Sequence, residues 1–230
     1  MSIGFKTYTP DGKEQLNSAI PNMRVVATGV ADVAMAIGRI PIPDLYPESP
    51  MMLIKPPPGV FVGGVQCFQR NRLIGNCFQY QSNGAFQWAL CSTVGSPISI
   101  GDGKAGLKIW DETGKLIFTP QFKYPRIQTL VSIQSPPYSQ GATSRSVSFQ
   151  ALAKSPWIIA QDAAMVFETS GGGDTGFPPF CYSIAIGGAL NSLTVQMRNT
   201  DDFSPSGYQA ANDVFNGKMM RFPLCDIPGL

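Results

Sequence analysis

The chain contains no histidine among its 230 residues. Histidine is the commonest general base near neutral pH, so its absence excludes Ser-His-Asp and Cys-His catalysis and zinc sites of the H-E-x-x-H type. The remaining class of hydrolase relies on paired carboxylates, as glycosidases do. The 15 acidic residues are scattered in turn-like contexts, and their spacing singles out no pair. We therefore expect no catalytic residues and no enzyme.

Charged residues are also few. They make up 14% of the chain, and the net charge is +2 without a cluster of Lys and Arg. Nucleic-acid binding needs basic side chains gathered on one face, so we expect no nucleic-acid partner. Residues 25–37, the most apolar stretch, are interrupted by Asp32 and are too short to span a bilayer, and residues 1–13 lack the layout of a secretory signal. These observations predict synthesis in the cytosol and no membrane insertion.

The cysteines show no pattern of a disulfide framework or of a zinc site. Their number is odd, and no C-x-x-C spacing occurs. We expect reduced, buried thiols and neither a metal nor a cofactor. The five residues are Cys67, Cys77, Cys91, Cys181 and Cys225.

A glycine-rich run resembles a phosphate-binding loop only superficially. It lacks the lysine of that loop, and residues 177–179 (Phe-Pro-Pro) follow it instead of the start of a helix. A surface loop is the better interpretation, and loops on rigid β scaffolds often carry binding contacts. The run is therefore a candidate partner-binding loop. It consists of Gly171, Gly172, Gly173, Asp174, Thr175 and Gly176.

The chain is rich in residues that punctuate the backbone, with 24 glycines and 20 prolines beside a hydrophobic content of 43%. Short strands joined by many turns fit this balance, so the expected fold class is all-β. One short helix is expected at residues 208–215. The strands are expected at residues 23–29, 51–55, 60–70, 77–81, 85–92, 126–134, 145–152, 157–161, 165–168, 180–186 and 193–198.

A ten-residue pattern occurs twice. Residues 4–13 and 106–115 share both glycines, both lysines and an aromatic position, and each copy predicts a strand, a tight turn and a second strand. The same offset brings Arg24 onto Arg126. Coincidence is the alternative, because Gly and Lys are common around turns. We favour the other interpretation, in which the repeated pattern indicates an internal duplication of the chain.

Further correspondences extend the repeat. Residues 49–54 resemble residues 155–159, and residues 78–80 lie at the original offset from residues 180–182. The expected architecture is two β-sandwich-like halves related by internal duplication. Their expected domain ranges are 1–102 and 103–230.

The end of the chain, residues 203–230, has two interpretations. It is either an arm that docks on a partner or the last strand of its own half. The arm would present an apolar run as an interface. The candidate interface residues are Met219, Met220, Phe222 and Leu224.

The larger aromatic residues also have two interpretations. They could form a sugar-stacking platform, or they could anchor the core or an interface, which is commoner for Trp and Tyr in alternating strands. The residues concerned are Tyr46, Trp88, Trp110, Trp157 and Tyr208.

The second copy of the repeat carries a family resemblance. Residues 106–118 read G-L-K-I-W-D-E-T-G-K-L-I-F, and K-Y-P-R-I follows at residues 123–127. This pattern resembles small phage-encoded tail proteins, which are encoded among the tail-tip or tail-fiber genes of long-tailed phages. That family has no established catalytic residues, so no site is carried over. In the first copy Glu14, Gln15 and Leu16 replace the apolar triplet, so its second strand is expected to be more exposed or displaced.

The resemblance implies a structural virion protein of a bacteriophage tail tip or baseplate. Such a protein would assemble in the host cytoplasm with other phage tail proteins and with further copies of itself, near the host-facing end. The alternative is a receptor-binding or carbohydrate-binding module that touches the host surface directly. A carboxylate-based hydrolase acting on the host envelope is the least favoured hypothesis.

Overall fold

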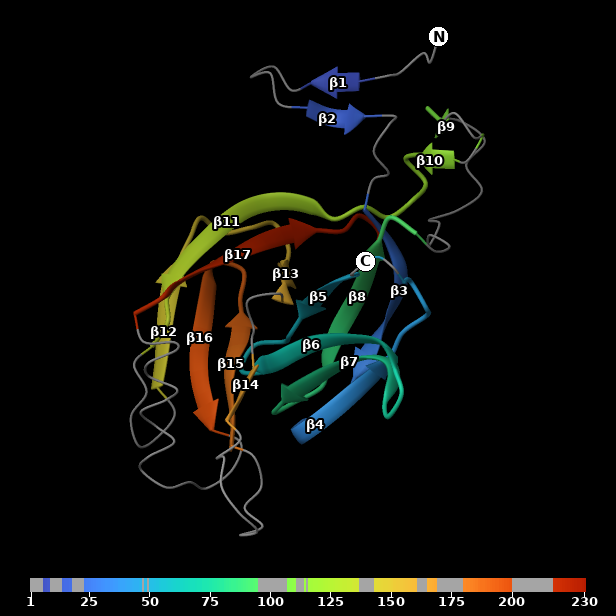
Figure 1. The fold of residues 1–230 in the computed structure, drawn as a ribbon. Helices are drawn as coiled ribbons and strands as arrows, with labels where there is room; N and C mark the ends of the chain where they lie inside the picture. Colours follow the sequence, from blue (N-terminus) through green and yellow to red (C-terminus); the bar gives the residue numbers. More distant parts are fainter. Residues whose placement is uncertain are drawn as a thin grey trace.

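The computed structural model is built from antiparallel β-sheets (Figure 1). No helix occurs in the part of the chain that the structure describes, and the predicted all-β class is confirmed. The expected helix at residues 208–215 lies outside that part. The described residues are 6–8, 14–17, 23–46, 48, 50–94, 107–110, 114, 116–136, 143–160, 165–168, 180–199 and 217–230.

Two large sheets form the body, and two small hairpins accompany them. Sheet 1 has the order β11 (Arg126–Gln134), β17 (Met219–Asp226), β13 (Trp157–Ile159), β5 (Met51–Lys55), β8 (Phe86–Ser92) and β3 (Arg24–Ala31). Sheet 2 has the order β12 (Thr143–Ser148), β16 (Ser192–Asn199), β15 (Phe180–Gly188), β6 (Val62–Asn71), β7 (Gly75–Ser82) and β4 (Ala34–Pro41), and β14 (Met165–Glu168) also pairs with β15. The hairpins are β1 (Lys6–Tyr8) with β2 (Glu14–Asn17), and β9 (Ile109–Trp110) with β10 (Leu116–Phe118).

The strand orders reveal the duplication directly. The first half of the chain contributes β3-β8-β5 to sheet 1 and β4-β7-β6 to sheet 2. The second half contributes β11-β17-β13 and β12-β16-β15, which follow the same path through the two sheets. The hairpin of each copy precedes its six strands. In both sheets the strands of the second half are therefore followed by their counterparts of the first half in reverse order. A pseudo-twofold relation between the halves requires this arrangement.

The pairing register repeats as well. Arg24 lies opposite Ser92 across β3 and β8, and Arg126 lies opposite Asp226 across β11 and β17. The register then shifts between residues 25 and 27 in the first pair and between residues 127 and 129 in the second. A β-bulge therefore occurs at the same place in both copies, which chance similarity would not produce.

The two halves do not form separate sandwiches on either side of residue 102. Ile54 in β5 lies opposite Ile158 in β13, and Gly63 in β6 lies opposite Ala185 in β15. These antiparallel pairs join the halves edge to edge, so each sheet runs through both of them. The main core cluster between the sheets likewise contains side chains of both halves. Three-stranded sheets leave two open edges, and joining one edge of each satisfies its backbone groups.

One expected correspondence within the repeat is wrong. Residues 78–80 lie in β7, whereas residues 180–182 begin β15, whose counterpart by position in the sheet is β6. The counterpart of β7 is β16. The additional strand β14 lengthens the second half before β15, so a constant offset cannot align the two halves beyond that point.

The described end of the chain is a strand of its own half and not an arm. β17 is internal, with β11 on one side and β13 on the other. Of the four candidate interface residues, Met220, Phe222 and Leu224 are buried in the main core. Only Met219 among these four is exposed, at 61%. The expected interface is therefore largely core.

Every strand expected from the sequence is present, but β4 was not expected. This strand pairs with β7, and Gly38 lies opposite Tyr80. A Cβ atom added to Gly38 would lie 2.3 Å from Cζ of Tyr80, so the aromatic ring rests directly on the backbone of the edge strand. The Tyr80 hydroxyl donates a hydrogen bond to the carbonyl of Asp32 (3.0 Å), and its ring packs edge-on against Phe86 (centroids 5.1 Å apart). Glycine thus permits this close approach.

We expect Gly38→Ala to lower the free energy of unfolding by about 1–3 kcal/mol, because the new methyl group must displace a packed ring. Denaturant unfolding measures the change. In a Tyr80→Leu background the same substitution should cost much less, since the ring is gone. An equal cost in both backgrounds would contradict this explanation.

Candidate binding surface

The two faces of sheet 1 carry two separate clusters of buried side chains. Ile54 and Leu224 belong to the cluster that also includes sheet 2 residues, so they face the space between the sheets. Trp157 and Cys225 belong to a second cluster whose strand residues all come from sheet 1. Because side chains alternate along a strand, the second cluster marks the opposite, outer face.

A row of side chains crosses this outer face. Val30 lies opposite Gln87, and Gln87 lies opposite Lys55. In the other half Trp157 lies opposite Cys225. The Lys55 Nζ lies 5.4 Å from the centroid of the Trp157 ring, so a cation–π contact connects the rows of the two halves.

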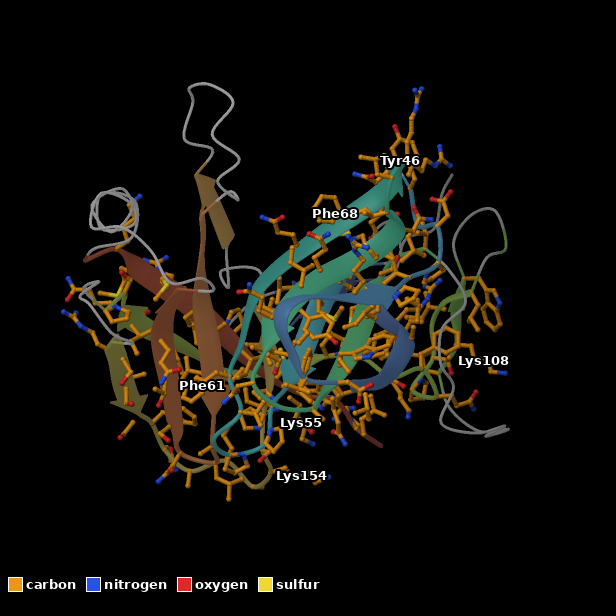
Figure 2. The ribbon with its side chains drawn as sticks, turned by 90° about the horizontal axis from the view of Figure 1, so that it is seen from below. Tyr46, Lys55, Phe61, Phe68, Lys108 and Lys154 are labelled. Atoms are coloured by element: carbon orange, nitrogen blue, oxygen red, sulfur yellow. The ribbon has the colours of Figure 1, made fainter. Side chains whose placement is uncertain are left out.

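Two hollows lie along this row. The first has a volume of about 380 Å³ and is lined by Val30, Lys55, Pro56, Pro57, Pro58, Ala85, Phe86, Gln87 and Ser155. The second has a volume of about 130 Å³ and is lined by Gln128, Leu152, Ala153, Lys154, Ser155, Pro156, Cys225 and Asp226. Ser155 lines both, so the two hollows adjoin. Figure 2 shows Lys55 and Lys154 on the same side of the molecule.

The first half fills its own copy of the second hollow. Because residues 49 and 50 match residues 155 and 156, Glu48 corresponds to Lys154, and the pairing register makes Ser92 correspond to Asp226. The Glu48 carboxylate accepts hydrogen bonds from the Ser92 hydroxyl and from the backbone amides of Thr93 (2.9 Å) and Val94 (3.2 Å). The site is thus closed by a side chain of the same half.

These hydrogen bonds also set the ionisation of Glu48. Burial raises the pKa of its carboxyl, but the hydrogen bonds from Ser92, Thr93 and Val94 outweigh that effect and hold the pKa below its ordinary value of 4.5. The side-chain amide of Gln69 fixes the same segment by donating to the Glu48 carbonyl and accepting from the Leu45 amide (2.9 Å). Glu48 is therefore a charged side chain that fills a space in which Ser92, Thr93 and Val94 supply its hydrogen bonds.

The second half has the corresponding space, but a different side chain stands at the position of Glu48. Lys154 is exposed, Asp226 is half-buried, and Pro228, which has no N–H, stands where the first half has Val94. Within the described residues, the side chains of Gln128, Lys154 and Asp226 form no hydrogen bond or ion pair. The second hollow therefore presents polar groups that no neighbouring described group uses.

A second exposed feature is the tip of the β6–β7 hairpin. Arg70 forms an ion pair with Asp44 (Nε to Oδ2, 3.1 Å), and its guanidinium lies 4.3 Å from the centroid of the Tyr46 ring. The backbone amide of Tyr46 and the Arg70 side chain together lower the pKa of Asp44. Leu73 at the turn is 93% exposed, and its amide is fixed by the Asn71 side chain (2.9 Å). Figure 2 shows Tyr46 beside this tip.

The structure describes only some of the residues that the sequence singled out as candidate sites. The glycine-rich run at residues 171–176 and Tyr208 lie outside the described residues. Trp157 is buried, and Trp88 packs against Gly29, where an added Cβ would lie 2.7 Å from the indole. These two tryptophans anchor the body and do not form an open sugar-stacking platform.

The second hollow was missed in the sequence, although one signal pointed to it. Aligning residues 49–50 with residues 155–156 sets Glu48 against Lys154, a reversal of charge within a repeat. Asp226 gave no signal of its own, because its position opposite Arg126 depends on the pairing of β17.

Three of the four cysteines whose side chains the structure describes are buried, as expected. Cys77, Cys91 and Cys225 are buried, and burial raises the pKa of Cys91 and of Cys225 to about 12. Cys67 is exposed, which corrects the expectation of a uniformly buried set. The side chain of Cys181 lies outside the description.

Comparison with known protein families, with curated proteins and with solved structures gives no match for this chain. Among the described residues, no helix is both long and apolar enough to cross a membrane. In the same ranges, no three potential metal-ligating side chains gather.

We expect Glu48→Gln to lower the free energy of unfolding at neutral pH by about 1–2 kcal/mol, because the hydrogen bonds to a charged acceptor are weakened. The folded-state pKa of Glu48 is depressed, so its contribution is complete above the ordinary pKa and is lost as the pH falls through the folded-state value. The difference between the two proteins should therefore be present at neutral pH and should disappear in acid, once the pH has fallen below the lowered pKa of Glu48.

Lys154→Gln at the corresponding position of the second half serves as the control. It should change stability by less than about 0.5 kcal/mol at either pH, since Lys154 is exposed. Chemical denaturation at the two pH values provides the measurement. A destabilisation by Glu48→Gln that persists in acid would show that the charge of Glu48 does not contribute to stability.

Proposed function

We propose that this protein is a structural subunit of a bacteriophage tail tip or baseplate, which assembles by protein–protein contacts near the host-facing end. The resemblance of residues 106–127 to small phage-encoded tail proteins supports this function. Part of that run forms the β9–β10 hairpin, and the first copy of the pattern forms β1–β2. Both hairpins lie beyond the same end of the sandwich, at the top of Figure 1. A shared end of this kind suits attachment to a neighbouring tail protein.

The observation that carries the proposal is the apolar character of the outer edges of sheet 1. Edge strand β11 exposes Ile127 (66%) and Leu130 (55%), and edge strand β3 exposes Val30 (67%). Edge strands offer unpaired backbone groups to another chain, and monomeric proteins usually protect them with charges or covering segments. Burying one such side chain contributes about 1.5–3 kcal/mol. These edges are therefore suited to assembly.

The duplication gives the molecule two such edges. β3 and β11 are counterparts, and they lie at opposite ends of the six-stranded order. A partner that pairs with one edge finds a related edge on the other side. Repeated copies of the chain would use both edges, which supports a homo-oligomer.

A second candidate function is recognition of a host receptor or carbohydrate. The two adjoining hollows on the outer face of sheet 1 favour it, because they bring Lys55, Lys154 and Asp226 together with apolar walls. Ligand sites commonly combine a mainly apolar lining with a few polar groups.

Cryo-electron microscopy of the intact phage particle tests the structural function. We expect density for this chain in the tail tip or baseplate, in contact with other tail proteins. Purified particles that lack the chain would overturn the proposal.

We also expect Leu130→Lys to weaken self-association at least about tenfold, since a charge must then be buried at the paired edge. Analytical ultracentrifugation over a range of concentrations measures the effect. Leu73→Lys is the matched control, because Leu73 is more exposed but lies on a hairpin tip away from the edges of sheet 1. Equal association of the wild-type protein and the Leu130→Lys variant would exclude the edge as the interface.

A further inference from the structure

We propose that the second hollow binds one sugar ring of a host-surface glycan. The inference rests on the second candidate function, recognition of the host surface, and it names both the ligand class and the residues. Gln128, Lys154, Ser155 and Asp226 supply the polar groups, and Leu152 and Pro156 supply apolar contact.

The duplication provides the first argument. In the first half the corresponding space is occupied by the Glu48 carboxylate, which three donors hold. In the second half Lys154 stands at the position of Glu48, and the carboxylate of Asp226 stands at the position of the hydroxyl donor Ser92. Two changes at facing positions therefore remove an internal ligand and leave its space open, with a volume of about 130 Å³.

The chemistry of the rim provides the second argument. The Asp226 carboxylate only accepts hydrogen bonds and the Lys154 ammonium only donates them, whereas Gln128 and Ser155 do both. A simple anion would meet Asp226, and a simple cation would meet Lys154. An uncharged ligand with several hydroxyl groups satisfies donors and acceptors alike, and its C–H face can rest on Leu152 and Pro156.

The size and surroundings of the hollow agree with this ligand. An engineered cavity of about 150 Å³ holds a benzene molecule, so a hollow of about 130 Å³ has room for the ring of one sugar, whose outer hydroxyl groups would remain outside it. Ser155 connects the second hollow to the larger first hollow, where Lys55 and three prolines form the walls. Further sugar units of the same chain would lie along that path.

Titration of the isotopically labelled full-length protein with glucose, galactose and N-acetylglucosamine, followed by NMR, tests the proposal. At least one sugar should shift the amide signals of Gln128, Lys154 and Asp226, with a dissociation constant of about 1 mM. Asp226→Asn and Lys154→Ala should each weaken binding at least about tenfold. Lys108→Ala, an exposed change on the β9–β10 hairpin, should leave binding unchanged.

The double variant Lys154→Glu with Asp226→Ser restores the carboxylate and the hydroxyl donor of the first half, although Pro228 offers no N–H in place of the Val94 amide. It should abolish sugar binding while the protein stays folded, as judged by an unchanged pattern of amide signals elsewhere. Sugar binding that survives in this variant would overturn the proposal. So would an absence of shifts with all three sugars, or shifts only with charged amino acids used as a comparison.

The outcomes separate this inference from the structural function. Density in the tail tip without sugar binding would refute the sugar site and leave the structural subunit intact. Sugar binding by a protein that is absent from the particle would do the reverse.

Discussion

The structure depends on the joint between the two halves. Across it Ile54 pairs with Ile158 in sheet 1, and Gly63 pairs with Ala185 in sheet 2. Each half alone would be two three-stranded sheets with open edges and only part of a core. Joined, both sheets become six strands wide, and Ile54 and Ile158 are almost completely buried among side chains from both copies. A short strand such as β13 is stable because strands of both halves flank it.

Duplication also explains how a binding surface can arise without a new fold. Two copies of one local structure start with the same space between their side chains. Only one copy needs to keep this space filled. In the first half Glu48 stabilises the end of β8 through its hydrogen bonds. In the second half Lys154 and Asp226 leave the corresponding space open as the second hollow. A contact function on the outer face can therefore develop while the shared core between the sheets stays intact.

The sequence predicted the local features and missed those that depend on distant pairing. The strands of alternating or continuous apolar residues and the repeated hairpins were recognisable, and the shared bulge follows the repeat offset of Arg24 and Arg126. β4 was missed because its Ala and Gly residues have low strand propensity, and Tyr80 compensates by covering Gly38. β17 contains Pro223, a residue that is rare in internal strands. The joint and the second hollow unite residues far apart in the chain, which periodicity cannot reveal.

Native-state hydrogen exchange tests the joint most directly. If the halves form one cooperative body, the amides of β5 and β13 exchange only through global unfolding, with the same and highest free energy in the protein. The strands of both halves then lose protection together as denaturant is added. Protection that persists in β3, β5 and β8 after β11, β13 and β17 have exchanged would show two independently stable halves and would contradict this account.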